Sequence, residues 1–242
     1  MGTMTQSLRG KAAIVTGGSR GIGYAICRRL VESGASVVLC GRSREGVDSA
    51  VRELAVSAPE GCKVCGTTAD ISRREDVEAL FAFADIHLPA LNILVNNAGV
   101  GIFRNSAELE WEEWRRVLDT NLTGVYLCSR AAVPRFRNAG SGFIINISSL
   151  AGKNPFAGGA AYNASKFGLN GFSEAMMLDL RYDNIRVSSI MPGSVATEFG
   201  RGPTDWKIAP EDVAEVVHTV LTLPDRTLVS AVEIRPSRPP AK

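Results

Sequence analysis

The chain has 242 residues, of which 45% are hydrophobic and 21% are charged, and its formal net charge at pH 7 is +2. These values suit one α/β domain that buries most of its apolar surface, and the interspersed acids and bases give no reason to expect nucleic acid as a partner. No apolar run approaches the ~20 residues that span a bilayer, and the start lacks a secretory pattern, so we expect no membrane partner and a cytoplasmic protein.

Short β-branched runs alternate with amphipathic stretches along the chain, which predicts a parallel sheet flanked by helices. The predicted strands are Ala12–Thr16, Ser36–Cys40, Lys63–Thr67, Ile93–Asn96, Phe143–Ile147, Val187–Ile190 and Leu228–Ile234. The predicted helices are Ile22–Ser33, Gly46–Ser57, Arg74–Asp85, Trp111–Phe136, Tyr162–Arg181 and Pro210–Leu221. Right-handed crossovers then indicate a doubly wound, seven-stranded Rossmann-type sheet of order 3-2-1-4-5-6-7. We expect one domain over residues 1–242, with its core at 8–235 and loose ends at 1–7 and 236–242.

A glycine-rich segment follows the first strand and opens the first helix: Thr16-Gly17-Gly18-Ser19-Arg20-Gly21-Ile22-Gly23. Glycine lets the backbone approach a pyrophosphate closely, and a helix N-terminus offers N–H groups and the positive end of a dipole. A plain strand-to-helix turn explains one or two of these glycines, but not three in this context. The segment therefore predicts a dinucleotide site.

The end of the second strand indicates which cofactor binds. Folds that select NAD place an acid there for the ribose 2′-hydroxyl, and this acid repels a 2′-phosphate. Here Gly41 and Arg42 hold that position, and Arg20 lies in the glycine-rich segment nearby. Two guanidinium groups that converge on one point suit a phosphate, so we expect NADP(H).

The positions of the cysteines and histidines predict neither a metal site nor a disulfide framework. The five cysteines stand at irregular positions, which favours a reducing compartment. Cys62 and Cys65 form a C-x-x-C on an expected strand, where positions three apart face opposite sides. The only histidines, His87 and His218, lie in or beside separate helical segments. We therefore expect neither a metal site nor a Ser-His-Asp triad.

A tyrosine and a lysine four positions apart, Tyr162 and Lys166, share one face of a predicted helix. A free phenol titrates near ~10, and an ammonium group beside it is expected to lower its pKa toward the range of a general acid or base. Ser149 ends the preceding strand, 13 positions before Tyr162. Both side chains are expected at the carboxyl edge of the sheet, where open α/β sheets bind ligands.

Taken together, these motifs resemble the short-chain dehydrogenase/reductase family, including its 3-oxoacyl-carrier reductases. The resemblance rests on T-G-x-x-x-G-x-G at Thr16, Asn96-Asn97-Ala98-Gly99, Ser149, Tyr162-x-x-x-Lys166 and Pro192-Gly193, and it covers the chain from about Leu8 to Ile234. It implies the catalytic residues Asn121, Ser149, Tyr162 and Lys166. It implies cofactor contacts from Gly17, Ser19, Arg20, Gly21, Ile22, Gly23, Arg42, Asp70, Ile71, Asn97, Ala98, Gly99, Tyr162, Lys166, Pro192, Gly193, Val195 and Thr197.

The implied reaction is hydride transfer between nicotinamide and a carbonyl or carbinol carbon, without a metal. Ser149 would hold the substrate oxygen, Tyr162 would supply the proton, and Lys166 would hold the ribose hydroxyls. Asn121 would anchor a water that relays protons to Lys166. Substrate-side positions are expected at Val100–Phe103, Pro155–Gly159 and Phe199–Ile208, where Phe103, Phe156, Phe199 and Trp206 suggest an apolar pocket.

Several alternatives stay open at this point. A carrier-protein substrate would need basic positions that fall here on Gly140 and Asp183, although Arg137 and Arg181 are possible substitutes. A nucleotide-binding sensor on the same fold, with little turnover, is the alternative from another functional class. A homodimer or homotetramer is also expected, through helices 111–136 and 162–181, because both carry apolar residues on more than one face.

Overall fold

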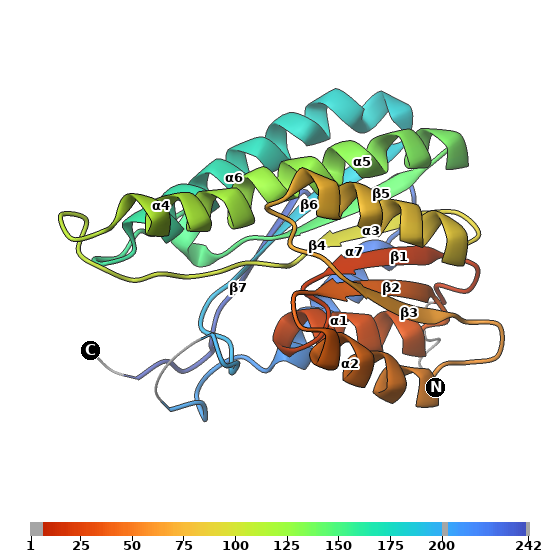
Figure 1. The fold of residues 1–242 in the computed structure, drawn as a ribbon, viewed down its shortest axis with the longest axis horizontal. Coiled ribbons are helices and arrows are strands. Elements are labelled where there is room, and N and C mark those ends of the chain that lie inside the picture. Colours follow the sequence, from red (N-terminus) through yellow and green to blue (C-terminus); the bar gives the residue numbers. More distant parts are fainter. Residues whose placement is uncertain (1–6, 200–202, 241–242) are drawn as a thin grey trace.

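The computed structural model describes residues 7–199 and 203–240; positions 1–6 and 241–242 of the expected loose ends lie outside these ranges. Seven strands form one parallel sheet of order β3-β2-β1-β4-β5-β6-β7, which confirms the predicted order (Figure 1). The strands are β1 Ala12–Thr16, β2 Ser36–Gly41, β3 Val64–Thr68, β4 Ile93–Asn96, β5 Gly142–Ile147, β6 Ile185–Pro192 and β7 Ala231–Ile234. The helical elements are α1 Gly21–Glu32, α2 Arg44–Val56, α3 Arg74–His87, α4 Trp111–Leu118, η1 Asp119–Thr123, α5 Gly124–Ala139, η2 Leu150–Gly152, α6 Ala160–Leu180, η3 Arg181–Asp183 and α7 Pro210–Thr222.

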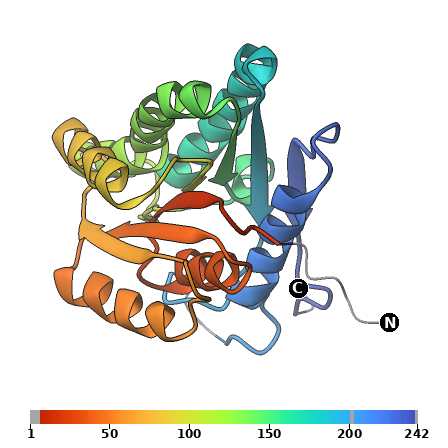
Figure 2. The same cartoon turned by 90° about the vertical axis from the view of Figure 1, so that its right-hand side faces the viewer.

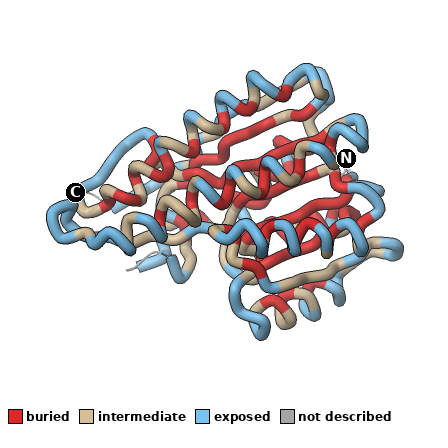
Figure 3. Tube along the Cα trace, turned by 45° about the horizontal axis from the view of Figure 1, so that its top comes forward, coloured by how far each residue is buried: buried red, intermediate tan, exposed pale blue. Residues whose placement is uncertain are grey.

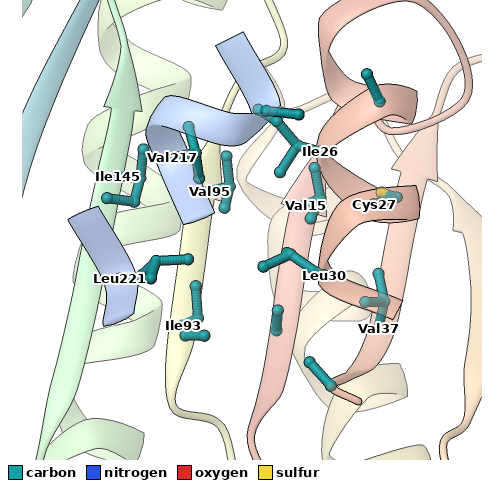
Figure 4. Close-up of a cluster of buried hydrophobic side chains, with 14 of the residues drawn as sticks. Val15, Ile26, Cys27, Leu30, Val37, Ile93, Val95, Ile145, Val217 and Leu221 are labelled. Carbon is teal, nitrogen blue, oxygen red and sulfur yellow. The ribbon is translucent and has the colours of Figure 1, made fainter. Parts of the chain in front are cut away.

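Helices cover both faces of the sheet (Figures 1 and 2). In β1, Ala13 and Val15 join a hydrophobic cluster with α1, α2 and α7, whereas Ala12 and Ile14 join one with α3, α5 and α6. Figure 4 shows the first cluster between α1, α7 and the strands, and Figure 3 shows that burial follows the strands and the inner sides of the helices. A parallel sheet buried on both faces reads as continuous apolar runs, which is why the strands were recognisable in the sequence.

The helix predicted over 111–136 is divided in the structure. A π-helical segment, η1, separates α4 from α5, and the N–H of Gly124 donates to the carbonyl of Asp119, five residues earlier. The prediction of one uninterrupted helix was therefore wrong. A π-turn inserts one residue without ending the apolar pattern, and such turns are frequent at functional sites. Asn121 lies within this turn.

The last strand is also shorter than predicted, because it begins at Ala231 and not at Leu228. Its ladder with β6 starts where Ser189 pairs with Ala231. Just before this pair, the side-chain hydroxyl of Ser188 donates to the carbonyl of Val229, at 2.5 Å. A side chain thus replaces the backbone ladder at that position. The other predicted strands and helices agree with the structure to within a few residues at each end.

The cysteines fall into two groups by burial. Cys27, Cys40 and Cys128 are buried, and burial raises the pKa of each thiol, to about 12 for Cys40. Cys62 and Cys65 are partly exposed and therefore accessible, although partial burial also raises the pKa of Cys65. Because the thiolate is the nucleophile, we expect the native protein at pH 8 to react with Ellman's reagent through Cys62 and Cys65 alone. Unfolding in guanidinium should release all five thiols. A third thiol that reacts rapidly in the native protein would contradict this assignment.

In the described part of the chain, no helix has the length and apolarity required to cross a membrane.

Candidate functional site

The predicted site residues meet at the carboxyl edge of the sheet. The glycine-rich turn follows β1, the segment Asn97-Ala98-Gly99 follows β4, and Ser149 follows β5. Helix α6 begins beyond the end of β5 and carries Tyr162 and Lys166 in its first two turns (Figure 1). Adjacent parallel strands therefore bring the turn, the Asn-Ala-Gly segment and the serine to the edge where such sheets bind ligands.

The glycine-rich turn is held against the segment after β4. The Nδ2 of Asn97 donates to the carbonyls of Thr16 and Gly17, both at 3.0 Å, and the Oγ1 of Thr16 accepts from the N–H groups of Asn97 and Ala98 at 3.0 and 3.1 Å. Gly17 has φ +63°, and a Cβ there would lie 2.9 Å from the Cα of Ala98; a Cβ on Gly23 would lie 2.2 Å from the Gly17 carbonyl. Both positions require glycine, because the backbone segments are in contact.

A cavity of about 470 Å³ lies between this turn and the ends of β2 and β3. It is lined by Gly17, Ser19, Arg20, Cys40, Gly41, Arg42, Ser43, Gly46, Ala69, Asp70, Ile71, Ala98, Gly99 and Thr120. The lining brings together the predicted residues from the turn, from the ends of β2 and β3, and from the segment after β4. The predicted residues Gly21, Ile22, Gly23 and Asn97 are not part of this lining; Gly23 and Asn97 instead support the turn.

The chemistry of this cavity fits a dinucleotide. No side chain caps the N-terminus of α1, and its first turn contains no acidic residue, so the positive end of the helix dipole is not neutralised there. β2 ends at Gly41, followed by Arg42 and not by an acid. Arg20 lines the same cavity but forms an ion pair with Glu198, so its guanidinium already has an anionic partner.

Asp70 contributes a carboxylate to the same lining. Burial raises its pKa, but hydrogen bonds from the side chain and backbone of Ser72 and the charge of Arg42 outweigh this and hold the pKa below its usual value. The Oδ1 accepts from the Ser72 hydroxyl at 2.7 Å and from its N–H at 3.0 Å. Asp70 is therefore an ionised hydrogen-bond acceptor at neutral pH.

The segment after β6 reaches back to the glycine-rich turn. The N–H of Gly193 donates to the carbonyl of Ile234 at 2.8 Å, and Val195 forms an isolated bridge with Ile208. A Cβ on Gly21 would lie 3.4 Å from the Cγ2 of Thr197. Thr197 thus lies beside the start of α1, whereas the contacts of Gly193 and Val195 are with Ile234 and Ile208.

Tyr162 and Lys166 lie on the same side of α6, with the Lys166 Nζ 5.7 Å from the centroid of the phenol ring. Lys166 is buried, and its Nζ donates to the carbonyl of Ile147 at 2.9 Å. The Ser149 side chain lies close enough to the Tyr162 phenol to lower its pKa, and its Oγ accepts from the N–H of Ala151 at 3.1 Å. The three predicted side chains are therefore brought together.

The pKa values of Tyr162 and Lys166 differ from the expectation based on their spacing in the sequence. Burial raises the pKa of Tyr162 above its usual value, and the nearby Ser149 side chain lowers it only in part. Burial lowers the pKa of Lys166 to about 8. The expected lowering of the phenol pKa by Lys166 is not found, because Lys166 bonds to a carbonyl and desolvation dominates both groups.

Asn121 in η1 connects the site to the segment after β4. Its Oδ1 accepts from the N–H of Val100 at 2.8 Å, and its Nδ2 donates to the Val100 carbonyl at 2.9 Å and to the Ser165 Oγ at 3.1 Å. The Ser165 Oγ in turn donates to the carbonyl of Tyr162 at 2.8 Å. The π-turn therefore places an amide that joins the loop after β4 to the helix that carries the tyrosine.

Known proteins share this sequence and arrangement. The family model for short chain dehydrogenases matches residues 11–207. Dehydrogenase/reductase SDR family member 4 of Oryctolagus cuniculus is 37% identical over 215 residues, which cover 88% of this chain and 81% of the relative. The 3alpha-hydroxysteroid dehydrogenase of Mediterraneibacter gnavus is 36% identical over 196 residues, which cover 81% and 78%.

The chain belongs to the short-chain dehydrogenase/reductase family. It is an oxidoreductase of this family. A metagenomic short-chain oxidoreductase solved in complex with NADP superposes with a TM-score of 0.85 at 40% identity, over 96% of this chain and 99% of that one. The alcohol dehydrogenase of Thermococcus sibiricus, complexed with 5-hydroxy-NADP, superposes with a TM-score of 0.87 at 28% identity, over 96% of this chain and 99% of that one.

The aromatic residues that we expected on the substrate side of this oxidoreductase gather around Tyr162. The rings of Phe103 and Phe199 each lie 5.7 Å from the phenol ring between centroids, and Phe156 lies 5.7 Å from Phe103. Trp206 forms no ring contact of this kind with the described residues. Positions 200–202 of the expected substrate segment lie outside the described residues.

Three contacts in the site were not predicted from the sequence. They are the ion pair of Arg20 with Glu198, the bond from Lys166 to the Ile147 carbonyl, and the link from Asn121 to Ser165. The first joins residues far apart in the chain, and the second uses a backbone atom that every residue has, so neither leaves a sequence signal. Ser165 lies inside the Tyr-x-x-x-Lys motif, and its position on α6 next to Lys166 is the one available clue.

Proposed function

We propose that this oxidoreductase uses NADP(H) and reduces a carbonyl group to an alcohol, with Tyr162 as the proton donor. The observation that supports it is the proximity of the Tyr162 phenol to the Ser149 side chain, one helical turn from the buried Lys166. Because its pKa is raised, the phenol is protonated at neutral pH. A proton donor is what the reduction requires, so this charge state favours the reductive direction.

The cofactor would be held by the cavity lining and the α1 N-terminus on one side, and by Lys166 and the segment at Thr197 on the other. When bound, the nicotinamide supplies the hydride in reduction or accepts it in oxidation. Arg42 supports the choice of NADP(H), because it lines the cavity directly after a strand that ends without an acid. The two related structures that contain NADP or its 5-hydroxy derivative support the same choice.

The side chains of this enzyme then divide the remaining work. Ser149 donates a hydrogen bond to the substrate oxygen and holds it next to the phenol. Tyr162 gives its proton to that oxygen as negative charge develops there, and the Lys166 ammonium compensates the phenolate that remains. Both N–H donors of the Asn121 side chain are already used, so a water that relays protons to Lys166 would be held by a carbonyl oxygen of Asn121.

Turnover of NADPH tests this proposal most directly. Loss of nicotinamide absorbance should be measured against a panel of ketones, with NADPH and NADH in parallel. Reduction of at least one ketone, with NADPH preferred, is the expected result. A protein that binds NADPH but consumes it with no ketone and no alcohol in reverse would instead be a sensor on the same fold.

The structure gives little support to an acyl-carrier substrate. Arg137, one of the two possible substitutes for the missing basic positions, donates two hydrogen bonds to the carboxylate of Asp183, at 2.7 and 2.9 Å. This pair is neutral overall, so it offers no excess positive charge to an acidic carrier. We therefore do not include the carrier in the proposed function.

We also propose that the enzyme is a homodimer or homotetramer that associates through α5 and α6. Phe167, Gly171, Ala175 and Leu178 are exposed on α6 at helical spacing, and the side chains of Phe167 and Leu178 are large and apolar. These four residues form one stripe. Gly171 and Ala175 leave room at its centre, so a second helix can approach closely.

Replacing Ala175 with glutamate should dissociate this assembly, because it places a charge at the centre of the stripe. We expect light scattering at micromolar concentrations to give a dimer or tetramer for the wild type and a shift toward the 25.8 kDa monomer for the variant. Ile86→Glu on α3, where the side chain is 79% exposed, is the matched control and should not dissociate it. A monomeric wild type would contradict the proposed assembly.

A further inference from the structure

Three phenylalanine rings, which we name the Phe cluster, lie beside the proposed proton donor, and two of them contact its ring. The three are Phe103, Phe156 and Phe199, and they come from three separate segments of the chain. Their exposed fractions are 50%, 45% and 47%, so about half of each ring has no protein partner in the described residues. Isolated exposed apolar residues are ordinary, but here Phe103 contacts both other rings, and the three half-exposed rings beside one polar group form an apolar patch suited to a ligand.

The backbone is shaped to admit these rings. A Cβ on Gly101 would lie 2.7 Å from both Phe103 and Phe199, and a Cβ on Gly159 would lie 2.6 Å from Phe156. Glycine at these two positions therefore creates the space that the cluster occupies.

Two further contacts hold the cluster in place. An isolated parallel bridge joins Arg104 to Gly159, and the Nδ2 of Asn163 donates to the carbonyl of Phe156 at 3.0 Å. Asn163 lies next to Tyr162 on α6, so the cluster and the phenol are positioned by the same helix. Rings that are already positioned lose little conformational freedom when a ligand binds.

The charged side chains adjacent to the cluster are already paired. Arg104, next to Phe103, donates to Glu113 at 2.8 Å, and Glu198, next to Phe199, pairs with Arg20. Among the described residues next to these rings, no cation is left over to neutralise a carboxylate or phosphate on the substrate; positions 200–202 lie outside the described residues. A charged group placed among the rings would lose hydration without gaining a partner.

We infer that the substrate is an uncharged ketone, or the matching secondary alcohol, in which an aromatic or alicyclic ring is bonded directly to the carbonyl or carbinol carbon. The ring packs among Phe103, Phe156 and Phe199 while the oxygen reaches Tyr162 and Ser149. This inference rests on the proposed function, because it assigns the Phe cluster to the substrate of that same reaction. Ring edges and faces at these distances favour another ring in tilted or edge-on contact.

The test compares three ketones with NADPH as the reductant: acetophenone, its charged analogue 4-acetylbenzoate, and acetone. We expect the kcat/KM for acetophenone to exceed the other two by about tenfold to a hundredfold, the range that burial of a ring supplies. The ring of Phe156 contacts Phe103 and is not in ring contact with Tyr162. In the Phe156→Ala variant, the ratio of the kcat/KM for acetophenone to that for each other ketone should fall by about tenfold, mainly through a higher KM for acetophenone. Phe83→Ala on α3, where the ring stacks on His87, is the matched control and should keep the wild-type ratio.

Binding separates failure of the inference from failure of the proposed function. In saturation-transfer NMR with NADP+ present, 1-phenylethanol should bind to the wild type and more weakly to Phe156→Ala. Binding that depends on Phe156, without turnover of any ketone, would leave the assignment of the Phe cluster and overturn the proposed reaction. Turnover with equal kcat/KM for the three ketones, or an unchanged ratio in Phe156→Ala, would overturn the inference and leave the proposed reaction.

Discussion

Replacing Tyr162 with phenylalanine is expected to lower kcat by at least ~10³-fold while leaving the affinity for NADPH nearly unchanged. The substitution removes the hydroxyl that Ser149 contacts and keeps the ring that packs against Phe103 and Phe199. Loss of the phenol hydroxyl removes the proton donor, and general acid catalysis alone contributes ~10²–10⁴-fold. Single-turnover kinetics of ketone reduction, together with NADPH fluorescence titration, would measure the two quantities separately.

Tyr182→Phe is the control for this substitution, because that phenol is 93% exposed and lies in η3, directly after α6. It should retain wild-type turnover. A Tyr162→Phe variant that kept more than about a tenth of the wild-type kcat would show that another group, or water, donates the proton.

The second large effect concerns Arg42, the residue that follows β2 in the cofactor cavity. We expect the wild type to prefer NADPH over NADH by about 10- to 10³-fold in kcat/KM, because each charge-assisted hydrogen bond contributes ~1.5–3 kcal/mol and each ~1.4 kcal/mol is a factor of ten. Arg42→Ala should lower kcat/KM with NADPH by about 10- to 100-fold and change NADH use little. Arg42 tests this better than Arg20, whose guanidinium also pairs with Glu198.

Two variants sharpen this result. Arg44→Ala removes the same charge two positions away, where the guanidinium is exposed and faces Asp48, so it should leave the preference unchanged. Gly41→Asp should shift the preference toward NADH, since a carboxylate accepts from a 2′-hydroxyl and repels a 2′-phosphate. Its Cβ would lie 2.8 Å from the hydroxyl of Ser19, a group that can rotate away. Equal wild-type efficiency with both cofactors, or equal losses in Arg42→Ala, would refute the role of Arg42.

Local patterns were enough to predict the sheet and the residues that line its carboxyl edge. The buried runs at Ala12–Thr16 and Ile93–Asn96 indicate strands because both of their faces are covered, and right-handed crossovers then restrict the order of the strands. The glycines at positions 17 and 23 were informative for a similar reason. Each lies where a Cβ would collide with backbone, so the local sequence records a tertiary contact.

The properties that depend on distant partners were decided by the tertiary structure. The π-turn at Asn121 is held by Val100 and Ser165, and an apolar repeat does not reveal it. The spacing of Tyr162 and Lys166 placed them on one side of a helix but predicted the wrong direction for the phenol pKa. The effect of desolvation on a pKa depends on all the atoms packed around the ionisable group, whereas the sequence spacing gives the position of one neighbouring side chain. Local sequence patterns thus specified which side chains meet at the carboxyl edge of the sheet. The charge states of these side chains and the shape of the surface around them depend on burial and on distant partners, which exist only in the folded chain.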